Sequence, residues 1–511
     1  MSKILVTITL FLSLCLGCSL ETEPSGISSF WNNEEDAKLG IDAAYAPFYE
    51  EEGFGRGHLW AGPASDDMVV NRQTTEIINL TSFINSSTNT GDGFYENWQI
   101  IYKIIRRAND VLRNVPAIDM NVSLQNRILG EANFLCGYCY FFQAKRYGGV
   151  PFYNYSTPND INKARETKQV TYENIEKYLL KSIDYFEKEQ LWHHSDDEWG
   201  RPNLGAALGL LAKVYLYWGK YDKAKEMSQK VIDSGEYELC ESYKMLFSLE
   251  GEKSDEVLFN LNNKNVRHQG TVTSIVMLSA KLTGGIGWYY FAPTKSLYDA
   301  FEDGDERRNV TLKGVGDEVN FLGVKTKLTS DNISDMTTGY MCTKYSSAYD
   351  KAKEWNWESG ADIPLLRYAD VLLINAEAKM RLAGASPENM NQPCQEATES
   401  LNQVRLRAFN WDKEKYISSP SFKDLIDERR RELAFEDERH YDLVRWRLAK
   451  EVYSKATLES DPRGARNFNE LMPCFALPQT EIDNSNGVLI NNVPEISPYT
   501  MFDFEMESLK D

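Results

Sequence analysis

Apolar residues recur at intervals of three and four over most of the chain, and this spacing predicts a mainly helical protein. The clearest example runs from Phe94 to Val115 and ends at Pro116, because proline does not continue a helix. The same pattern predicts a helix that begins after Asn32 or Asn33 and ends at Tyr45, and further helices over 124–147 and 171–189.

A turn centred on Gly219 separates two helical segments, Ala206–Trp218 and Asp222–Asp233. The small residues Ala212 and Ala224 allow these segments to approach closely, and the spacing resembles one tetratricopeptide repeat. A similar pair spans 368–382 and 394–407. Because one such repeat cannot bury its own apolar face, we expect several helical pairs to stack on one another.

Long irregular stretches separate the helical segments, at 51–90, 262–293, 309–362 and 461–511. Stretches of this length are usually functional or disordered. Their aromatic residues argue against disorder, and they include Trp60, Trp288, Tyr289, Tyr290, Trp355 and Trp357. A helical scaffold that carries aromatic loops is typical of a binding protein.

The first seventeen residues have the composition of a removable export signal. Lys3 precedes an apolar run from Ile4 to Leu16, which is too short to span a bilayer. Gly17 supplies the small residue before the cleavage point, and Cys18 would then be the first mature residue and a site for lipid attachment. Cys15 occupies the position where a lipobox has leucine, so an ordinary signal peptide is the alternative.

The acidic composition and the scattered cysteines exclude some classes of partner and of fold. The chain has 76 Asp and Glu against 56 Lys and Arg, a net charge of −20, which argues against a nucleic-acid partner. The remaining cysteines are scattered rather than arranged as a disulfide scaffold. Cys136 and Cys139 have redox-type spacing but lie in an apolar helical run, so we expect them to be packed in the core.

No catalytic or metal-binding motif stands out, and we predict a protein that is not an enzyme, has no cofactor and has no metal site among its candidate residues. The sequence leaves open whether a structural metal is required. His193 and His194 have no partner at helical spacing, which favours a solvated loop. The main enzymatic alternative is a glycoside hydrolase, which needs two carboxylates, and Asp66 and Asp67 are adjacent in an aromatic loop. Hydrogen bonding of these side chains to sugar or solvent is the favoured interpretation.

A charge-dense segment, Asp427–Glu436, is followed by His440–Trp446. Its Glu, Arg and His residues suggest an active site. However, Leu433, Phe435 and Tyr441 alternate with the charges at helical spacing. We therefore predict a buried network of ion pairs in the C-terminal part.

Several blocks resemble the SusD/RagB family of outer-membrane nutrient-binding lipoproteins, in the order in which that family has them. In Leu366–Glu377 and in the Arg-rich, Phe-Glu and Asp-Leu-x-Arg-Trp strings of 426–446 the similarity is most specific. Asp437 is a departure, because a glycine is common at this position. The other blocks are Glu131–Phe142 with Tyr147–Pro151, Gly200–Ala207 and Leu477–Asp483.

The resemblance implies an all-α-dominated fold in which four tetratricopeptide-like helical hairpins pack against a loop-rich ligand-binding half. A signal peptide, 1–17, would precede one domain, 18–511, with an N-terminal part over about 19–240 and a C-terminal part over about 255–511. The protein would be lipid-anchored through Cys18 in the outer membrane and face the cell exterior. It would bind glycan and deliver it to a SusC-like TonB-dependent transporter.

The resemblance also implies two candidate ligand-binding regions, both on loops. Sugar rings pack their C–H faces on aromatic rings, and their hydroxyls need polar partners. Capture of peptides or glycopeptides by the same fold is an alternative, as is a tetratricopeptide interaction scaffold. The candidate residues are Trp60, Asp66, Asp67, Arg72, Phe94, Tyr95 and Asn97 in the first region, and Trp288, Tyr289 and Tyr290 in the second.

Overall fold

The computed structural model describes residues 30–72, 74–84, 87–156, 162–266, 269–350 and 357–492. The predicted signal peptide, Cys18 and Trp355 lie outside the described residues. No helix in the described part of the chain is long and apolar enough to cross a membrane.

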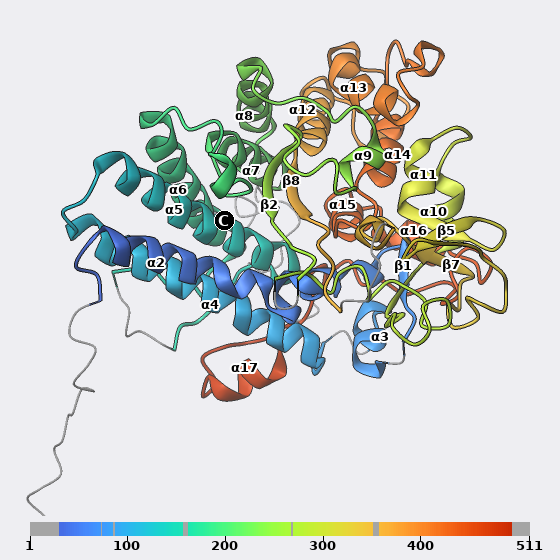
Figure 1. Ribbon diagram of the computed structural model, residues 1–511, viewed down its shortest axis with the longest axis horizontal. Helices are drawn as coiled ribbons and strands as arrows, with labels where there is room; N and C mark the ends of the chain where they lie inside the picture. The colour runs from blue at the N-terminus through green and yellow to red at the C-terminus, as the bar shows by residue number, and fades with distance from the viewer. Residues whose placement is uncertain are drawn as a thin grey trace, which may run out of the picture.

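Eight of the described helices pack as four pairs, and this arrangement confirms the all-α-dominated fold. They occupy the left and the top of Figure 1, where consecutive helices lie side by side. The pairs are α2 (Glu34–Tyr45) with α4 (Asp92–Asn114), α5 (Val122–Tyr147) with α6 (Lys168–Lys188), α7 (Leu204–Tyr217) with α8 (Tyr221–Ser234), and α12 (Tyr368–Leu382) with α13 (Thr398–Ala408).

Local signals in the sequence set the helix ends. Asn33 caps α2 by accepting a hydrogen bond from the Asp36 N–H at 3.1 Å. Gly219 has φ +76° in the turn between α7 and α8, a conformation that glycine adopts without strain. In α5, a Cβ on Gly137 would lie 2.7 Å from Leu179 of α6, so this glycine permits close packing of the pair.

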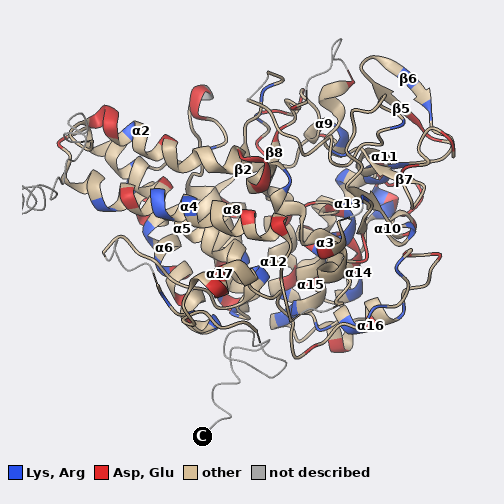
Figure 2. Ribbon diagram, turned by 90° about the horizontal axis from the view of Figure 1, so that it is seen from below, with Lys and Arg blue, Asp and Glu red and all other residues tan. Residues whose placement is uncertain are grey.

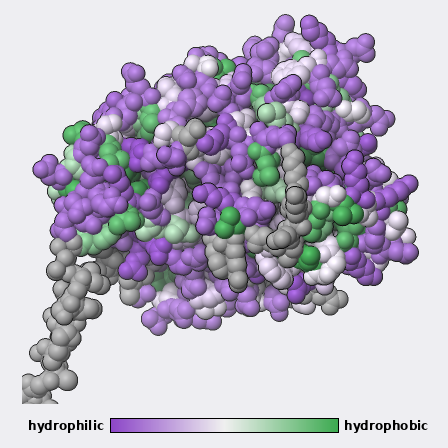
Figure 3. Space-filling model, in the orientation of Figure 1, coloured by the Kyte–Doolittle hydropathy of each residue, from purple (hydrophilic) through white to green (hydrophobic). Residues whose placement is uncertain are grey.

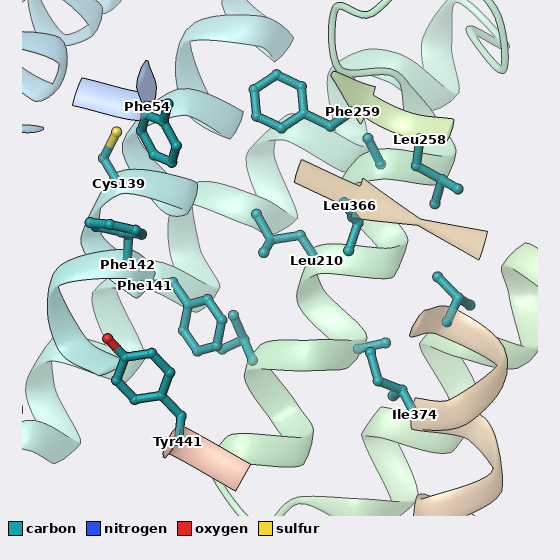
Figure 4. Close-up of a cluster of buried hydrophobic side chains, with 14 of the residues drawn as sticks. Phe54, Cys139, Phe141, Phe142, Leu210, Leu258, Phe259, Leu366, Ile374 and Tyr441 are labelled. Atoms are coloured by element: carbon teal, nitrogen blue, oxygen red, sulfur yellow. The ribbon is translucent and has the colours of Figure 1, made fainter. Parts of the chain in front are cut away.

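The hydrophobic core joins the helical pairs to a two-stranded sheet. This sheet pairs β2 (Val257–Leu261) with β8 (Ile363–Arg367) in antiparallel register. Figure 4 shows Phe259 and Leu366 from the sheet in the same buried cluster as Leu210 of α7 and Phe142 of α5. Cys136 and Cys139 are buried in this core as free thiols, which confirms the prediction of a packing role.

The segments expected to be irregular contain short elements instead. Antiparallel pairs join β1 (Met68–Val70) to β3 (Phe291–Pro293), β4 (Leu312–Gly314) to β7 (Tyr340–Cys342), and β5 (Glu318–Phe321) to β6 (Val324–Lys327). Many of these elements lie on the right of Figure 1. The remaining helices are α3 (Thr75–Thr81), α9 (Tyr243–Leu246), α10 (Lys295–Ala300), α11 (Glu306–Thr311), α14 (Phe422–Glu432), α15 (Arg439–Arg445), α16 (Ala449–Ser454) and α17 (Gln479–Asn484).

A buried network of ion pairs connects these elements, as the charge-dense segment predicted. Glu432 of α14 is its centre and accepts from Arg407 at 2.5 Å, Arg367 at 2.9 Å and Arg307 at 3.1 Å. All of these side chains are almost fully buried. Since removal of one member would leave a buried charge without its partner, the network locks α11, α13, α14 and β8 together.

His440 lies in the interior, packed among aromatic rings. It is buried, and its Nδ1 lies 3.0 Å from the Tyr453 hydroxyl. Burial, with a contribution from Arg466, lowers the pKa of His440 to about 3. The imidazole is therefore neutral at physiological pH.

Charged residues are distributed over the view in Figure 2, and hydrophilic residues dominate the view in Figure 3. Lys and Arg alternate with Asp and Glu along the described ribbon in Figure 2 and form no continuous cationic stripe there. The face in Figure 3 is mostly hydrophilic, with small separate apolar patches.

Candidate ligand-binding surface

Aromatic and arginine side chains from four distant segments meet at the surface. The indole of Trp288 lies 6.1 Å from that of Trp357 and 6.4 Å from the Tyr290 ring, measured between ring centroids. Trp357 is 54% exposed, and Trp288, Tyr289 and Tyr290 are partly exposed. We refer to these residues together with Arg56 and Arg72 as the aromatic–arginine cluster.

Backbone hydrogen bonds hold the 288–290 segment in place. The N–H groups of Trp288 and Tyr290 donate to the carbonyl oxygens of Ile275 at 2.8 Å and Val276 at 2.7 Å. A Cβ at Gly287 would collide with the Leu278 carbonyl, so only glycine fits there. Strand β3 then pairs with β1, which brings Arg72 close to the tyrosines.

Both arginines stack on the same tyrosine. The guanidinium carbon of Arg56 lies 5.1 Å from the centroid of the Tyr290 ring, and that of Arg72 lies 4.7 Å from it. Arg56 is neutralised by Glu51 at 2.8 Å and Glu52 at 2.5 Å. Arg72 is exposed and has no carboxylate within 4 Å among the described residues, so it offers an available cation at the surface.

Trp60 lies beneath this cluster and not at its surface. It is 3% exposed, and its Nε1 donates to the Glu52 carboxylate at 2.6 Å. Its ring meets the Tyr290 ring edge to face at 5.9 Å. Trp60 therefore supports Tyr290 from below.

Asp66 and Asp67 are directed away from the cluster, into the protein. The Asp66 carboxylate contacts Arg439 at 2.9 Å and Arg430 at 3.0 Å, and Asp67 accepts from Arg430 at 2.8 Å. Burial acts to raise the pKa of Asp66, but the two arginines outweigh it and hold that pKa below its usual range. Burial raises the pKa of Asp67, which Arg430 only partly offsets. Both side chains are buried, so neither can contact a sugar at the surface of this conformation.

Two of the candidates on α4 are also buried. Asn97 donates to the carbonyl oxygens of Glu52 at 2.7 Å and Gly53 at 3.1 Å, and it accepts from Arg146 at 2.7 Å. Phe94 packs on Phe475, with ring centroids 5.4 Å apart. Tyr95 is partly exposed, and its hydroxyl accepts from Gln99 at 2.7 Å.

The structure thus brings together Arg72, Trp288, Tyr289 and Tyr290 above Trp60, and it separates them from the other predicted residues. Arg56 and Trp357 were absent from the predicted site. A signal for Arg56 existed, because it lies in the glycine-rich string Gly53–Gly57 beside a predicted aromatic loop. Within the described residues, no group of three or more His, Cys, Asp and Glu side chains is placed to hold a metal.

Comparison with known proteins gives consistent matches along the chain. A family model described as the SusD family matches residues 255–469, and one described as starch-binding associating with outer membrane matches residues 35–216. SusD-like protein P2 of Formosa agariphila is 26% identical over 525 residues, which cover 96% of this chain and 99% of that protein. The starch-binding protein SusD of Bacteroides thetaiotaomicron is 26% identical over 365 residues, covering 62% of this chain and 63% of that protein.

Solved structures share the fold. Surface glycan-binding protein A from Bacteroides thetaiotaomicron, in complex with laminarihexaose, has a TM-score of 0.73 at 23% identity, covering 90% of this chain and 100% of that one. A SusD-like protein from Bacteroides fragilis has a TM-score of 0.75 at 22% identity, covering 91% and 98%. With the family blocks in order and both halves of the chain matched, this protein belongs to the SusD/RagB family.

Proposed function

We propose that this protein binds glycan at the cell surface, with the aromatic–arginine cluster as the binding site. The cluster carries this proposal, because Trp288, Tyr290 and Trp357 offer exposed ring surface in one place. Apolar faces of sugar rings pack on such surfaces. Relatives whose names specify starch or laminarihexaose as the ligand support the same class of ligand.

We further propose that lipid attachment at Cys18 holds the protein on the outer face of the outer membrane. The bound glycan would then pass to a SusC-like TonB-dependent transporter. The description of the matching N-terminal family model, with its association with the outer membrane, supports this location. The short polar stretch after Cys18, with Glu21 and Glu23, would serve as a tether.

The buried positions of Asp66 and Asp67 favour a binding protein over a glycoside hydrolase. A hydrolase needs two carboxylates that flank the scissile bond in an accessible site. Both of these are instead occupied by arginines. Release of reducing ends by the purified protein from a polysaccharide that it binds would contradict this proposal.

The direct test is calorimetry or affinity electrophoresis with a panel of neutral polysaccharides, acidic polysaccharides and peptides. Trp288→Ala should weaken binding of a glycan ligand by about 1–3 kcal/mol, the effect of removing a stacking anchor. Trp411→Ala is the matched control, because Trp411 is 47% exposed and lies outside the cluster. Binding of peptides alone, or equal losses in the two variants, would contradict the proposal.

A further inference from the structure

A small cavity lies beside the β2–β8 sheet, away from the aromatic–arginine cluster. Its volume is about 20 Å³, and oxygen-bearing side chains of Glu252, Asn260 and Asp362 line it. A cavity of 10–15 Å³ already holds one water molecule or a comparable ion. The rest of the wall includes the apolar residues Phe247, Val257 and Pro364 and the hydroxyl-bearing residues Ser248 and Ser347.

Asp362 has no cationic partner. It directly precedes β8, and its Oδ1 accepts a hydrogen bond from the Asn263 N–H at 2.8 Å. Among the described residues, no Lys, Arg or His lies within ion-pair distance of its carboxylate. Burial raises the pKa of Asp362 to about 7. Hydrogen bonds from the Asn263 N–H and from the Asn260 side chain oppose the rise, and the nearby Glu252 carboxylate adds to it. This carboxylate therefore lacks the positive charge that would stabilise it.

Glu252 supplies a second carboxylate from the segment between α9 and β2. It makes no ion pair within 4 Å among the described residues, and burial raises its pKa despite the neighbouring Lys253. The Lys253 side chain lines a different, larger cavity, with His193 and Arg201. Two negative groups thus face one small cavity that contains no basic side chain.

Asn260 contributes the third oxygen atom. Its side chain is only 4% exposed, and its Oδ1 has no hydrogen-bond partner. The orientation of the amide is determined by its neighbours. Asn262 donates from Nδ2 to the Trp199 carbonyl, so its Oδ1 accepts from Asn260 Nδ2, at 2.7 Å. The other end of the Asn260 amide must therefore be its oxygen, and a buried amide oxygen without a donor is unfavourable.

We propose that Glu252, Asn260 and Asp362 bind a Ca²⁺ ion. Carboxylate and amide oxygens are ligands that Ca²⁺ prefers, and the site has no sulfur or imidazole donor to favour a softer metal. The ion would neutralise both carboxylates and satisfy the unpartnered Asn260 oxygen, with water or backbone carbonyls completing its coordination. The register of the β2–β8 sheet brings Asn260 and Asp362 close together. Asn260 of β2 lies opposite Pro364 of β8, and Pro364 is two residues after Asp362.

The proposed ion would also tie the 247–254 segment to the sheet. No sequence pattern indicates this site, because two of the ligands lie about a hundred residues from the third and match no motif. This inference is independent of glycan binding.

The test is calorimetric titration of the chelator-treated protein with CaCl₂, together with thermal unfolding with and without Ca²⁺. We expect one saturable site and a rise in the unfolding temperature. Asp362→Asn and Glu252→Gln should each weaken Ca²⁺ binding about tenfold or more, because each removes a charged ligand. Asp255→Asn is the matched control, since it removes a nearby exposed charge that does not line the cavity.

The Glu252 variant keeps the test decisive if Asp362→Asn does not fold, because Glu252 lies on an exposed segment. Absence of saturable Ca²⁺ binding to the unsubstituted protein would overturn the proposal. Unchanged binding in Glu252→Gln would overturn it as well.

Discussion

Arg439 donates two hydrogen bonds to the Asp66 carboxylate, at 2.9 and 3.1 Å. The residues lie 373 positions apart; Asp66 is buried, and the Arg439 side chain is 10% exposed. This pair joins the segment before β1 to α15. It shows that an acidic residue in an aromatic loop can belong to the scaffold.

Asp66→Ala should therefore destabilise the fold and not act selectively on ligand binding. Breaking a buried ion pair leaves the arginine without its partner and costs about 3–5 kcal/mol. Urea unfolding measures this loss, with the exposed Asp331→Ala as the control. A variant with native stability that no longer binds glycan would show instead that Asp66 is a ligand-binding residue.

Arg72→Ala should weaken glycan binding with only a small effect on stability. Its guanidinium stacks on Tyr290 at the exposed surface, and loss of this contact costs the fold about 0.5–1 kcal/mol. Binding should weaken because the variant lacks the cation that Arg72 presents beside the aromatic rings. Calorimetry should show this loss, whereas Arg106→Ala, a change at an exposed position of α4, should bind normally. Titration at two salt concentrations adds a second measurement, because a direct contact of Arg72 with an anionic group would make the loss salt-dependent. Equal affinities for Arg72→Ala and the unsubstituted protein would exclude Arg72 from the site.

The free energy of unfolding should fall as the pH rises, because the buried Asp437 carboxyl resists ionisation. Asp437 is buried, both of its carboxylate oxygens lack hydrogen-bond partners, and burial raises its pKa to about 7 although Arg146 and Lys145 oppose the rise. The folded state holds the proton of such an aspartate more tightly than the unfolded state does. Its contribution to stability is therefore complete only below pH about 4, where the carboxyl is protonated in both states. That contribution is lost as the pH rises through about 7.

Asp437→Asn removes this titration, and Asn tolerates the φ of +59° at this position. Its stability advantage over the unsubstituted protein should grow by about 2–3 kcal/mol between pH 5 and pH 8. Urea unfolding at both pH values measures the difference, with Asp331→Asn as the control. A difference that does not vary with pH would contradict the assignment of the raised pKa.

Cys18→Ala should release the protein from membranes, because the acyl chains on this residue are the proposed anchor. Fractionation of cells followed by detection of the protein in soluble and membrane fractions measures the effect. Cys15→Ala, which leaves the proposed acylation site intact, is the control. Continued attachment of the Cys18 variant would show that another segment holds the protein on the membrane.

Local patterns in the sequence determined much of the scaffold. Apolar spacing and Pro116 predicted the Phe94–Val115 helix close to the observed α4, Asp92–Asn114. The interleaved charges of 427–446 predicted the buried ion-pair network. These signals are readable because helix periodicity, capping and turn chemistry act between residues that are near one another in the chain.

Only the tertiary structure decided which candidate side chains reach the surface. In the sequence, Trp60 and Trp288 are both aromatic residues of predicted loops. In the structure, Trp60 is buried and donates a hydrogen bond to Glu52. Backbone hydrogen bonds to Ile275 and Leu278 hold the segment of Trp288 at the surface. Asp66 and Asp67 likewise form ion pairs with arginines that lie more than three hundred and fifty residues away in the sequence. Burial and ion pairing of this kind depend on contacts between distant segments, and such contacts have no local sequence pattern.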